Sequence, residues 1–349
     1  MSETLQCNLH NATVNHDIFL PHQFEGRLEG PDTGGGNADI YREKKLNHKY
    51  RVKLNAVNPP RKVGAPGSVS HGSVVDQKIL FVQIAIKCFR PRSSEDNLVQ
   101  TIANELKIWK ILNQSNNQNV APLLGVLTSH EYNGFLGTYI PPSPVCEYYQ
   151  NRDLDDFLRL HNPNPSRRFQ LLTGVVRGLA HVHKLLVVHG DLKASNVLVN
   201  DAGTVAKLCD FGSSRIDCAC DCGLENQCGT LPWDSPELFE GDVRTTMSDM
   251  WAFGCIALEA QFGKVPYNAN FLIAYRNMRK NLPPATRESV VSVDFISNAV
   301  WETMQRCWEF DPQSRPSAQA VLAEFEELES DDNSQPTITI PQNVVLGID

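Results

Sequence analysis

The stretch VHGDLKASNVLV, residues 188–199, contains the residues that decide the fold of this chain. Lys193 follows Asp191 by two residues, Asn196 follows it by five, and an apolar strand comes directly after. In-line phosphoryl transfer needs these residue types, because an aspartate orients and deprotonates the acceptor hydroxyl, a lysine holds the γ-phosphate and an asparagine binds metal. The spacing therefore predicts Asp191 and Lys193 as catalytic residues and Asn196 as a metal ligand.

A second motif, KLCDFG at residues 207–212, follows a short distance along the chain. It places Asp210 just past a short predicted strand, and Mg²⁺ prefers one or two such oxygen ligands together with substrate phosphates. An isolated Asp-Phe-Gly is usually a turn, since aspartate and glycine favour turns. The two motifs in this order support the chemical interpretation, in which Asp210 is the second metal ligand.

Together the two motifs resemble the signature set of the protein kinase family, and the resemblance covers about three quarters of the chain. It extends to the segment IAIK (84–87), which implies that Lys87 binds the α- and β-phosphates of ATP. Glu105 falls where the family places the helical glutamate that pairs with this lysine. The resemblance therefore implies ATP and Mg²⁺ as cofactors and proteins as substrates.

The order of the predicted elements agrees with the bilobal kinase fold, of class α+β, that the resemblance implies. Residues 79–89 predict a β-branched strand and residues 98–112 a helix, whereas the chain is mostly helical from Leu154 onward. We expect a small antiparallel β lobe with one helix, up to about residue 145, and a larger, mainly α-helical lobe from about residue 150.

The expected domain boundaries follow from polar, aperiodic sequence at both ends. Residues 1–28 predict a disordered or variable N-terminal segment, and residues 328–349 a disordered tail. The kinase domain is expected to span residues 29–327.

Three further positions resemble residues that brace the kinase fold. Glu237, in the segment SPE (235–237), and Arg315 resemble a pair of residues that contact each other in the family. Asp249 resembles the aspartate that braces the catalytic loop. This set tells against a small-molecule phosphotransferase, which would not be expected to carry the Glu237 segment with its arginine partner.

The amino-acid sequences of the motifs resemble those of serine/threonine kinases more than those of tyrosine kinases. The features that carry this are Lys193, two residues after the catalytic aspartate, and Gly229-Thr230 ahead of Trp233. The combination His-Gly-Asp-Leu-Lys with Gly-Thr-Leu-Pro-Trp is most similar to the tyrosine-kinase-like kinases expanded in fungi.

The connection between the lobes is expected at Cys146, Glu147 and Tyr149. Cys146 has the position that resembles the gatekeeper of the family, and the backbone of Glu147 and Tyr149 would meet the adenine of ATP. A plain interlobe linker is compatible with the same residues.

Two glycine-rich segments compete for the loop that covers the phosphates of ATP, where small residues let backbone N–H groups approach the ligand. The segment 33–42 offers Gly34, Gly35 and Gly36, but it leaves about forty residues before the next strand, against about 2–5 in a usual hairpin loop. The segment 64–72 fits the spacing to Lys87 better but has a proline at its tip. We predict the first segment.

Gly190 departs from the family pattern, since many kinases carry an arginine there that binds a phosphorylated activation loop. Between Asp210 and Gly229 the only hydroxyl side chains are Ser213 and Ser214, next to the metal-binding aspartate. We therefore predict a kinase whose activity does not depend on phosphorylation of this loop.

The same loop holds four cysteines that could bind zinc or respond to oxidation: Cys218, Cys220, Cys222 and Cys228. The spacing Cys-x-Cys-x-Cys lacks the usual pairing of zinc ligands, and no histidine lies nearby. Exposed thiols that need no partner are the favoured interpretation.

The bulk composition narrows the partners and the compartment. A net charge of −8 argues against general binding to nucleic acid, whose affinity rests on lysine and arginine. The N-terminus lacks the apolar stretch of a signal peptide, and no apolar run is long enough to span a membrane. We expect a cytoplasmic protein, with the nucleus also possible, and the sequence does not indicate the oligomeric state.

Two main functional hypotheses follow. The first is an active serine/threonine kinase, which is supported by the complete set of catalytic residues. The second is a weakly active or inactive pseudokinase that serves as a scaffold, and the unusual glycine segment is its one support.

Overall fold

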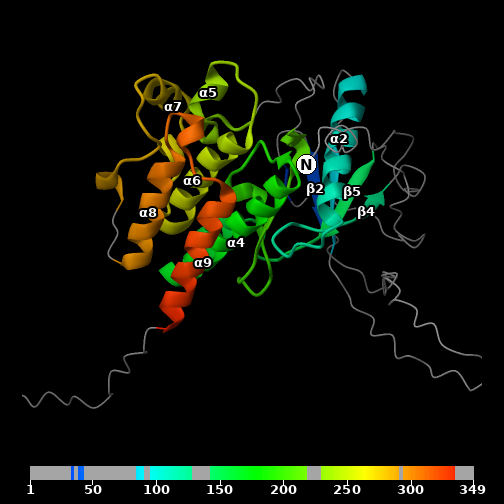
Figure 1. Ribbon diagram of the computed structural model, residues 1–349. Helices are drawn as coiled ribbons and strands as arrows, with labels where there is room; N and C mark the ends of the chain where they lie inside the picture. Colours follow the sequence, from blue (N-terminus) through cyan, green and yellow to red (C-terminus); the bar gives the residue numbers. More distant parts are fainter. Residues whose placement is uncertain are drawn as a thin grey trace, which may run out of the picture.

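The computed structural model describes residues 33–34, 38–42, 84–89, 95–127, 142–217, 229–290 and 294–334. A small sheet with helix α2 (Glu95–Asn113) forms one lobe, and a bundle of helices forms the other (Figure 1). This arrangement confirms the predicted bilobal α+β fold.

The small lobe is built on a five-stranded antiparallel sheet with the order β1-β2-β3-β5-β4. Its strands are β1 (Thr33–Gly34), β2 (Ala38–Arg42), β3 (Ile84–Phe89), β4 (Leu123–Leu127) and β5 (Ser143–Glu147). Strand β3 is central, with Lys87 opposite Ile40 of β2 and Ile84 opposite Glu147 of β5. The first residues of the predicted strand, 79–83, lie outside the described part of the chain.

Helix α2 confirms the helix predicted over 98–112 and extends it at both ends. Its buried residues Ile102, Leu106 and Trp109 recur at the spacing that places side chains on one face of a helix. The indole Nε1 of Trp109 donates a hydrogen bond of 2.7 Å to the carbonyl of Ala121. These contacts fix the helix, and with it the buried side chain of Glu105.

The chain between α2 and β4 is hydrogen-bonded to the larger lobe. The N–H of Ala121 donates to the carbonyl of Leu208 (2.8 Å), and the N–H of Leu208 donates to the carbonyl of Asn119 (2.9 Å). The side chain of Asn119 adds a bond of 2.8 Å to the carbonyl of Ala206. Because Leu208 lies two residues before Asp210, these bonds tie the segment that carries Asp210 to the small lobe.

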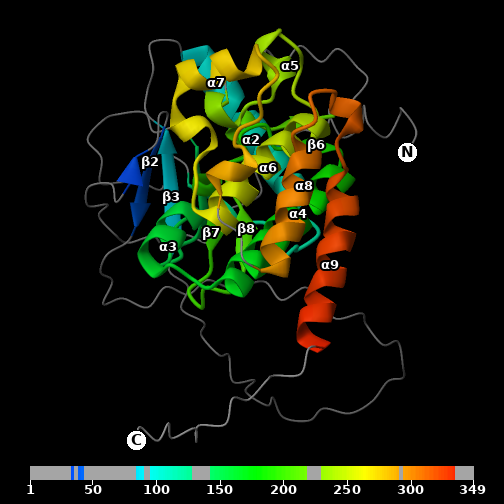
Figure 2. The same ribbon diagram turned by 90° about the vertical axis from the view of Figure 1, so that its left-hand side faces the viewer.

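The larger lobe consists mainly of helices, several of which lie side by side in Figure 2. Its α-helices are α3 (Leu154–His161), α4 (Pro165–Lys184), α5 (Pro236–Phe239), α6 (Thr246–Phe262), α7 (Phe271–Met278), α8 (Phe295–Cys307) and α9 (Ala318–Ser334). Two short antiparallel pairs, β6 (Val187–Val188) with β9 (Arg215–Ile216) and β7 (Val197–Val199) with β8 (Ala206–Leu208), flank the two motifs.

Helix α6 is the core of this lobe, since nearly all its residues are buried. A helix that is apolar on all sides belongs in the interior of a protein. It begins with a capping box, in which Thr245 and Ser248 satisfy each other's backbone N–H groups, and ends at Gly263 in the left-handed conformation. The buried position makes α6 a rigid support for the loops around it.

Helix α9 corrects the predicted start of the tail at residue 328, because the helix continues to Ser334. Leu328 packs against the hydrophobic core and so draws this turn into the domain. Residues 1–28 and 335–349 lie outside the described part of the chain, so the disorder expected there stays a prediction. Within the described residues, no helix is both long and apolar enough to cross a membrane.

Candidate active site

The two lobes are joined by a three-member ion cluster around Lys87. Its Nζ lies 2.8 Å from Oε1 of Glu105 on α2 and 2.6 Å from Oδ1 of Asp210, which follows β8. The sequence predicted all three residues for the ATP site, and the structure brings them together. A kinase needs the lysine–glutamate pair and the metal-binding aspartate in place at the same time, and this cluster satisfies both conditions.

The neighbouring charges favour the ionised forms of Lys87 and Asp210. Burial lowers the pKa of Lys87, but Glu105 and Asp210 outweigh it and raise that pKa above its ordinary value. Burial raises the pKa of Asp210, but Lys87 outweighs it and lowers that pKa below its ordinary value. The pKa of Glu105 is raised because its side chain is only 1% exposed. The lysine therefore remains a cation, as a phosphate-binding group must.

The backbone at Asp210 has an unusual conformation. Its φ of +61° lies in the left-handed region, which aspartate tolerates better than most residues, and its Oδ1 accepts a bond from the N–H of Gly212. The next residue, Phe211, is fully buried and packs against Trp109 of α2 and the ring of His189. Phe211 thus anchors the motif, while 42% of the Asp210 side chain remains accessible.

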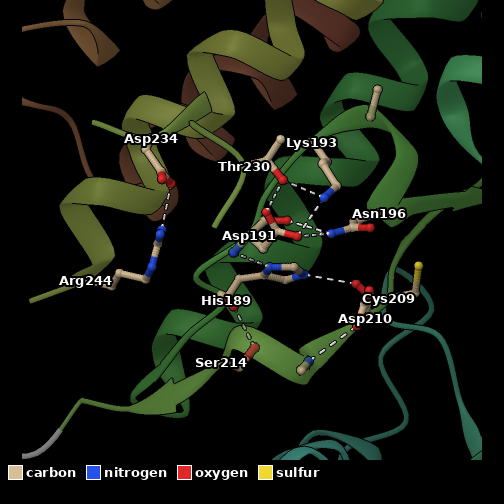
Figure 3. Close-up of polar contacts among 12 residues, drawn as sticks. His189, Asp191, Lys193, Asn196, Cys209, Asp210, Ser214, Thr230, Asp234 and Arg244 are labelled. Atoms are coloured by element: carbon tan, nitrogen blue, oxygen red, sulfur yellow. Dashed lines mark hydrogen bonds and ion pairs between the residues drawn. The ribbon is translucent and has the colours of Figure 1, made fainter. Parts of the chain in front are cut away.

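The catalytic loop forms a second polar network around Asp191 (Figure 3). The Nζ of Lys193 donates to Oδ2 of Asp191 (2.7 Å), and the hydroxyl of Thr230 donates to its Oδ1 (2.7 Å). Lys193 also donates to the Thr230 hydroxyl oxygen at 2.6 Å. Asp191 and Lys193 are thus adjacent, as the sequence predicted, and Thr230 joins them from the far end of the activation loop.

Asn196 is placed to act as a metal ligand beside Asp210. It lies in the short helix η2 (Ala194–Asn196), and its Nδ2 donates to the carbonyl (2.7 Å) and Oδ2 (3.0 Å) of Asp191. Both amide hydrogens are therefore directed at Asp191, and the amide oxygen is the group that remains to meet a cation. The N–H of Cys209 donates to the Asn196 carbonyl at 3.0 Å, which holds the two proposed ligands next to each other. Amide and carboxylate oxygens are the ligands that Mg²⁺ prefers, so these residues fit that ion.

Asp249 of α6 holds the backbone of the catalytic loop in place. Its carboxylate accepts hydrogen bonds from the N–H groups of His189 (2.7 Å) and Gly190 (2.9 Å), and it contacts the His183 ring at 2.9 Å. Burial raises its pKa, but these partners outweigh the burial and lower the pKa below its ordinary value. The bracing role that the resemblance implied for Asp249 thus matches its contacts.

Glu259, also on α6, connects the catalytic loop to the turn that follows the activation loop. Its Oε2 accepts from the indole Nε1 of Trp233 (2.9 Å) and from the N–H of Ala194 (3.3 Å). Burial raises the pKa of Glu259 to about 7. The sequence did not indicate this residue, because it lies outside the motif that singles out Asp249 on the same helix.

Glu237 and Arg315 form the pair that the sequence predicted. Two parallel bonds of 2.7 and 2.8 Å join the guanidinium of Arg315 to both carboxylate oxygens of Glu237. Arg315 also donates to the carbonyls of Met247 (2.9 Å) and Glu309 (2.8 Å). The pair links α5 to the end of the lobe and so supports the loop that leads into the active site.

The hinge residues lie between the lobes, at and just after the end of β5. The hydroxyl of Tyr149 donates to Oε2 of Glu147, and the Tyr149 ring lies under the Lys207 ammonium, 5.9 Å from the ring centroid. Burial raises the pKa of the neighbouring Cys146 thiol to about 12, so this thiol stays protonated. The role of the hinge backbone toward adenine stays a prediction.

The described residues include only part of the two glycine segments. The structure pairs β2 with β3, which places Ile40 opposite Lys87, and Gly34 ends β1. Gly35, Gly36, the segment 64–72 and the four loop cysteines (Cys218, Cys220, Cys222 and Cys228) lie outside the described residues. The choice of the first segment therefore remains a prediction.

The comparisons with known proteins agree on one protein family. The profile of the protein kinase domain matches residues 63–325, so it includes the second glycine segment and leaves out β1 and β2. The chain is 25% identical over 277 residues to "Probable serine/threonine-protein kinase SIS8" of Arabidopsis thaliana, covering 75% of this chain and 24% of that protein. It is 28% identical to "Mitogen-activated protein kinase kinase 1" of the same plant (75% and 71%), and 30% identical to "Ephrin type-A receptor 1" of Homo sapiens (67% and 23%). The chain thus spans about a quarter of the length of the first and third of these relatives.

Proposed function

The chain belongs to the protein kinase family, and we propose that it is an active protein serine/threonine kinase. It would transfer the γ-phosphate of ATP, with Mg²⁺, to serine and threonine side chains of other proteins. The observation that carries the proposal is the cluster in which Lys87 contacts Glu105 at 2.8 Å and Asp210 at 2.6 Å. An inactive scaffold has no need to keep these three charged groups in register across two lobes.

Each residue of the site has a role in the proposed reaction. Asp191 orients the acceptor hydroxyl and accepts its proton, while Lys193 offsets charge on the transferred phosphoryl group. Lys87 binds the α- and β-phosphates, and Glu105 keeps its ammonium in position. Asp210 and Asn196 would hold Mg²⁺, which would neutralise negative charge on the phosphates of ATP.

The preference for serine and threonine rests on Lys193 and Thr230. Their contact at 2.6 Å gives a physical basis to the sequence pattern that resembles serine/threonine kinases. The relatives include serine/threonine, dual-specificity and tyrosine kinases by name, so the choice of acceptor is a proposal. The grouping with the tyrosine-kinase-like kinases of fungi and the cytoplasmic location also stay predictions.

The pseudokinase scaffold is the second candidate function. Its support is the glycine segment 33–42, in which Thr33 and Ala38 replace glycines of the related pattern and would weaken the hold on ATP. It predicts ATP binding without phosphoryl transfer.

The test is transfer of labelled phosphate from Mg-ATP by the purified protein to itself and to a generic protein substrate. Asp191→Asn removes the base and should lower the rate by about 10²- to 10⁴-fold. Asp155→Asn, which changes an exposed carboxylate, is the matched control and should keep the wild-type rate. Phosphoserine or phosphothreonine as product would establish the assignment, phosphotyrosine alone would correct the acceptor, and ATP binding without transfer would favour the scaffold.

A further inference from the structure

Gly190 in the catalytic loop occupies a place that no other residue fits. Its φ of +81° lies in the left-handed region that favours glycine. A Cβ at this position would collide with the carbonyl oxygen of Ser213 and would lie 3.3 Å from Cδ of Arg244. The space where a side chain of residue 190 would begin is therefore occupied by the chain at Ser213 and by the aliphatic part of Arg244.

Arg244 lies just before α6 and reaches across to the end of the activation loop. Its Nη1 donates to Oδ1 of Asp234 at 2.9 Å, and a Cβ at Gly229 would collide with its Nη2. Its backbone carbonyl accepts a bond of 3.1 Å from the guanidinium of Arg215, next to the metal-binding motif. Figure 3 shows the ion pair beside the network of the catalytic aspartate.

The ion pair is nearly sealed from solvent. The side chain of Arg244 is 11% exposed and that of Asp234 is 9% exposed. A pair in such a place is only weakly screened by salt, and the loss of one partner leaves the other as an uncompensated buried charge. The ion pair therefore holds the chain just before α6 and the turn at residues 229–234 in a fixed relative position. We call this connection the joint.

We propose that Arg244 is a positioning residue for the phosphotransfer reaction. Through Asp234 it holds the turn at residues 229–234 against the catalytic loop, so that Thr230 stays in contact with Asp191 and Lys193. This proposal rests on the proposed kinase function and deepens it. In other kinases, an arginine at the position of Gly190 that binds a phosphorylated loop would hold this turn. Here Arg244, just before α6, holds it without a phosphate.

The joint acts on the acceptor side of the site rather than on the ATP side. Thr230 contacts the two residues that receive the acceptor hydroxyl, at 2.7 Å from Asp191 and 2.6 Å from Lys193. The cluster of Lys87 and Asp210 belongs to a separate set of contacts. Loosening the turn should therefore change how the acceptor is used and leave ATP binding intact.

The kinetic test uses Arg244→Met, which keeps an unbranched apolar side chain and removes the charge. The value of kcat/KM for a protein acceptor should fall by about 10- to 100-fold, as for a lost hydrogen bond between charged groups, with KM for ATP nearly unchanged. Arg244→Lys should recover part of the loss, because it restores the positive charge.

The matched control is Arg168→Met. Arg168 is also half-buried and donates to the carbonyls of Ala260 (2.9 Å) and Pro163 (2.8 Å), away from the catalytic loop. This variant should lose stability without the selective effect on the acceptor. An equal change of acceptor and ATP parameters in both variants would show that Arg244 is merely structural and would overturn the proposal.

Hydrogen exchange keeps the proposal testable without activity. The N–H groups of Trp233 and Asp234 are bonded inside the turn, to the carbonyls of Thr230 (2.9 Å) and Leu231 (3.2 Å). Arg244→Met should speed their exchange by about tenfold or more, while Arg168→Met should not. If the wild-type chain transfers no phosphate, the proposed function is refuted. The exchange rates still test whether Arg244 holds the turn at residues 229–234 in place. Unchanged exchange in Arg244→Met would refute it.

Discussion

Removal of the Glu237 carboxylate tests the most completely defined interaction in the larger lobe. The guanidinium of Arg315 is fully buried and is bound to Glu237 by two bonds of 2.7 and 2.8 Å. It also lies over the ring of Trp251, with 5.2 Å between the guanidinium carbon and the ring centroid. The substitution Glu237→Ala would leave this cation in place with its carbonyl partners but without a counter-charge.

The expected loss of stability follows from that burial. Loss of one partner of a buried ion pair costs about 3–5 kcal/mol, because the remaining charge stays buried and unpaired. Total unfolding free energies are about 5–15 kcal/mol, so this loss would be a large fraction of the stability of the domain. The control is Glu326→Ala, whose partner Arg177 lies at 3.0 Å but whose side chain is 50% exposed. Exposed pairs are worth about 0–1 kcal/mol, so the two variants should differ several-fold.

Urea denaturation followed by tryptophan fluorescence measures both losses from the midpoints and slopes. The pH adds a second check. Burial raises the pKa of Glu237, but Arg315 outweighs it and holds the pKa below its ordinary value of 4.5. The pair therefore contributes its full stability above that value and loses it as pH falls through the lower folded pKa. Equal losses in Glu237→Ala and Glu326→Ala at neutral pH, or a difference that does not shrink in acid, would refute the reasoning.

Two further predictions concern packing and pH. A Cβ at Gly178 would lie 2.5 Å from the carbonyl oxygen of Asn119, so Gly178→Ala should destabilise the protein by about 1–3 kcal/mol, as read from its thermal midpoint. The raised pKa of Glu259, about 7 against an ordinary 4.5, means that its contribution to stability is full in acid and is lost as pH rises through 7. Glu259→Gln keeps an acceptor for Trp233 and cannot ionise. Its unfolding temperature should therefore be higher than that of the wild type above neutral pH and equal to it near pH 4. The same difference in unfolding temperature at both pH values would contradict this prediction.

The predicted site residues that the structure brings together are those whose geometry is set by short stretches of chain. Asp191, Lys193 and Asn196 lie within six residues of one another, and the 3₁₀ turn of η2 brings their side chains together. Lys87 and Glu105 are far from them in sequence, but each sits in an element with a clear pattern, a β-branched strand and an amphipathic helix. Local pattern plus the order of motifs was therefore enough to place them.

Other parts of the site depend on contacts that no local pattern encodes. Glu259 lies outside every motif that the sequence offers, and its partners Trp233 and Ala194 come from two separate parts of the chain. The start of the tail was misplaced for a similar reason, because Leu328 is one apolar residue in an acidic stretch. Its helical state is decided by the core against which it packs, and that surface is assembled only in the folded chain.

The departure from the family pattern at Gly190 has two opposite interpretations when only the sequence is known. A glycine in place of a conserved type of cation could indicate a site that has lost its support, as the scaffold hypothesis requires, or a site supported in another way. The structure favours the second, since Arg244 occupies the adjoining space and binds Asp234 at 2.9 Å. The positive charge next to the catalytic loop is thus retained, but it comes from the start of α6, where a motif search has no reason to look. Because a fixed ion pair needs no phosphate, the same arrangement accounts for a loop that has hydroxyl groups only at Ser213 and Ser214, beside Asp210.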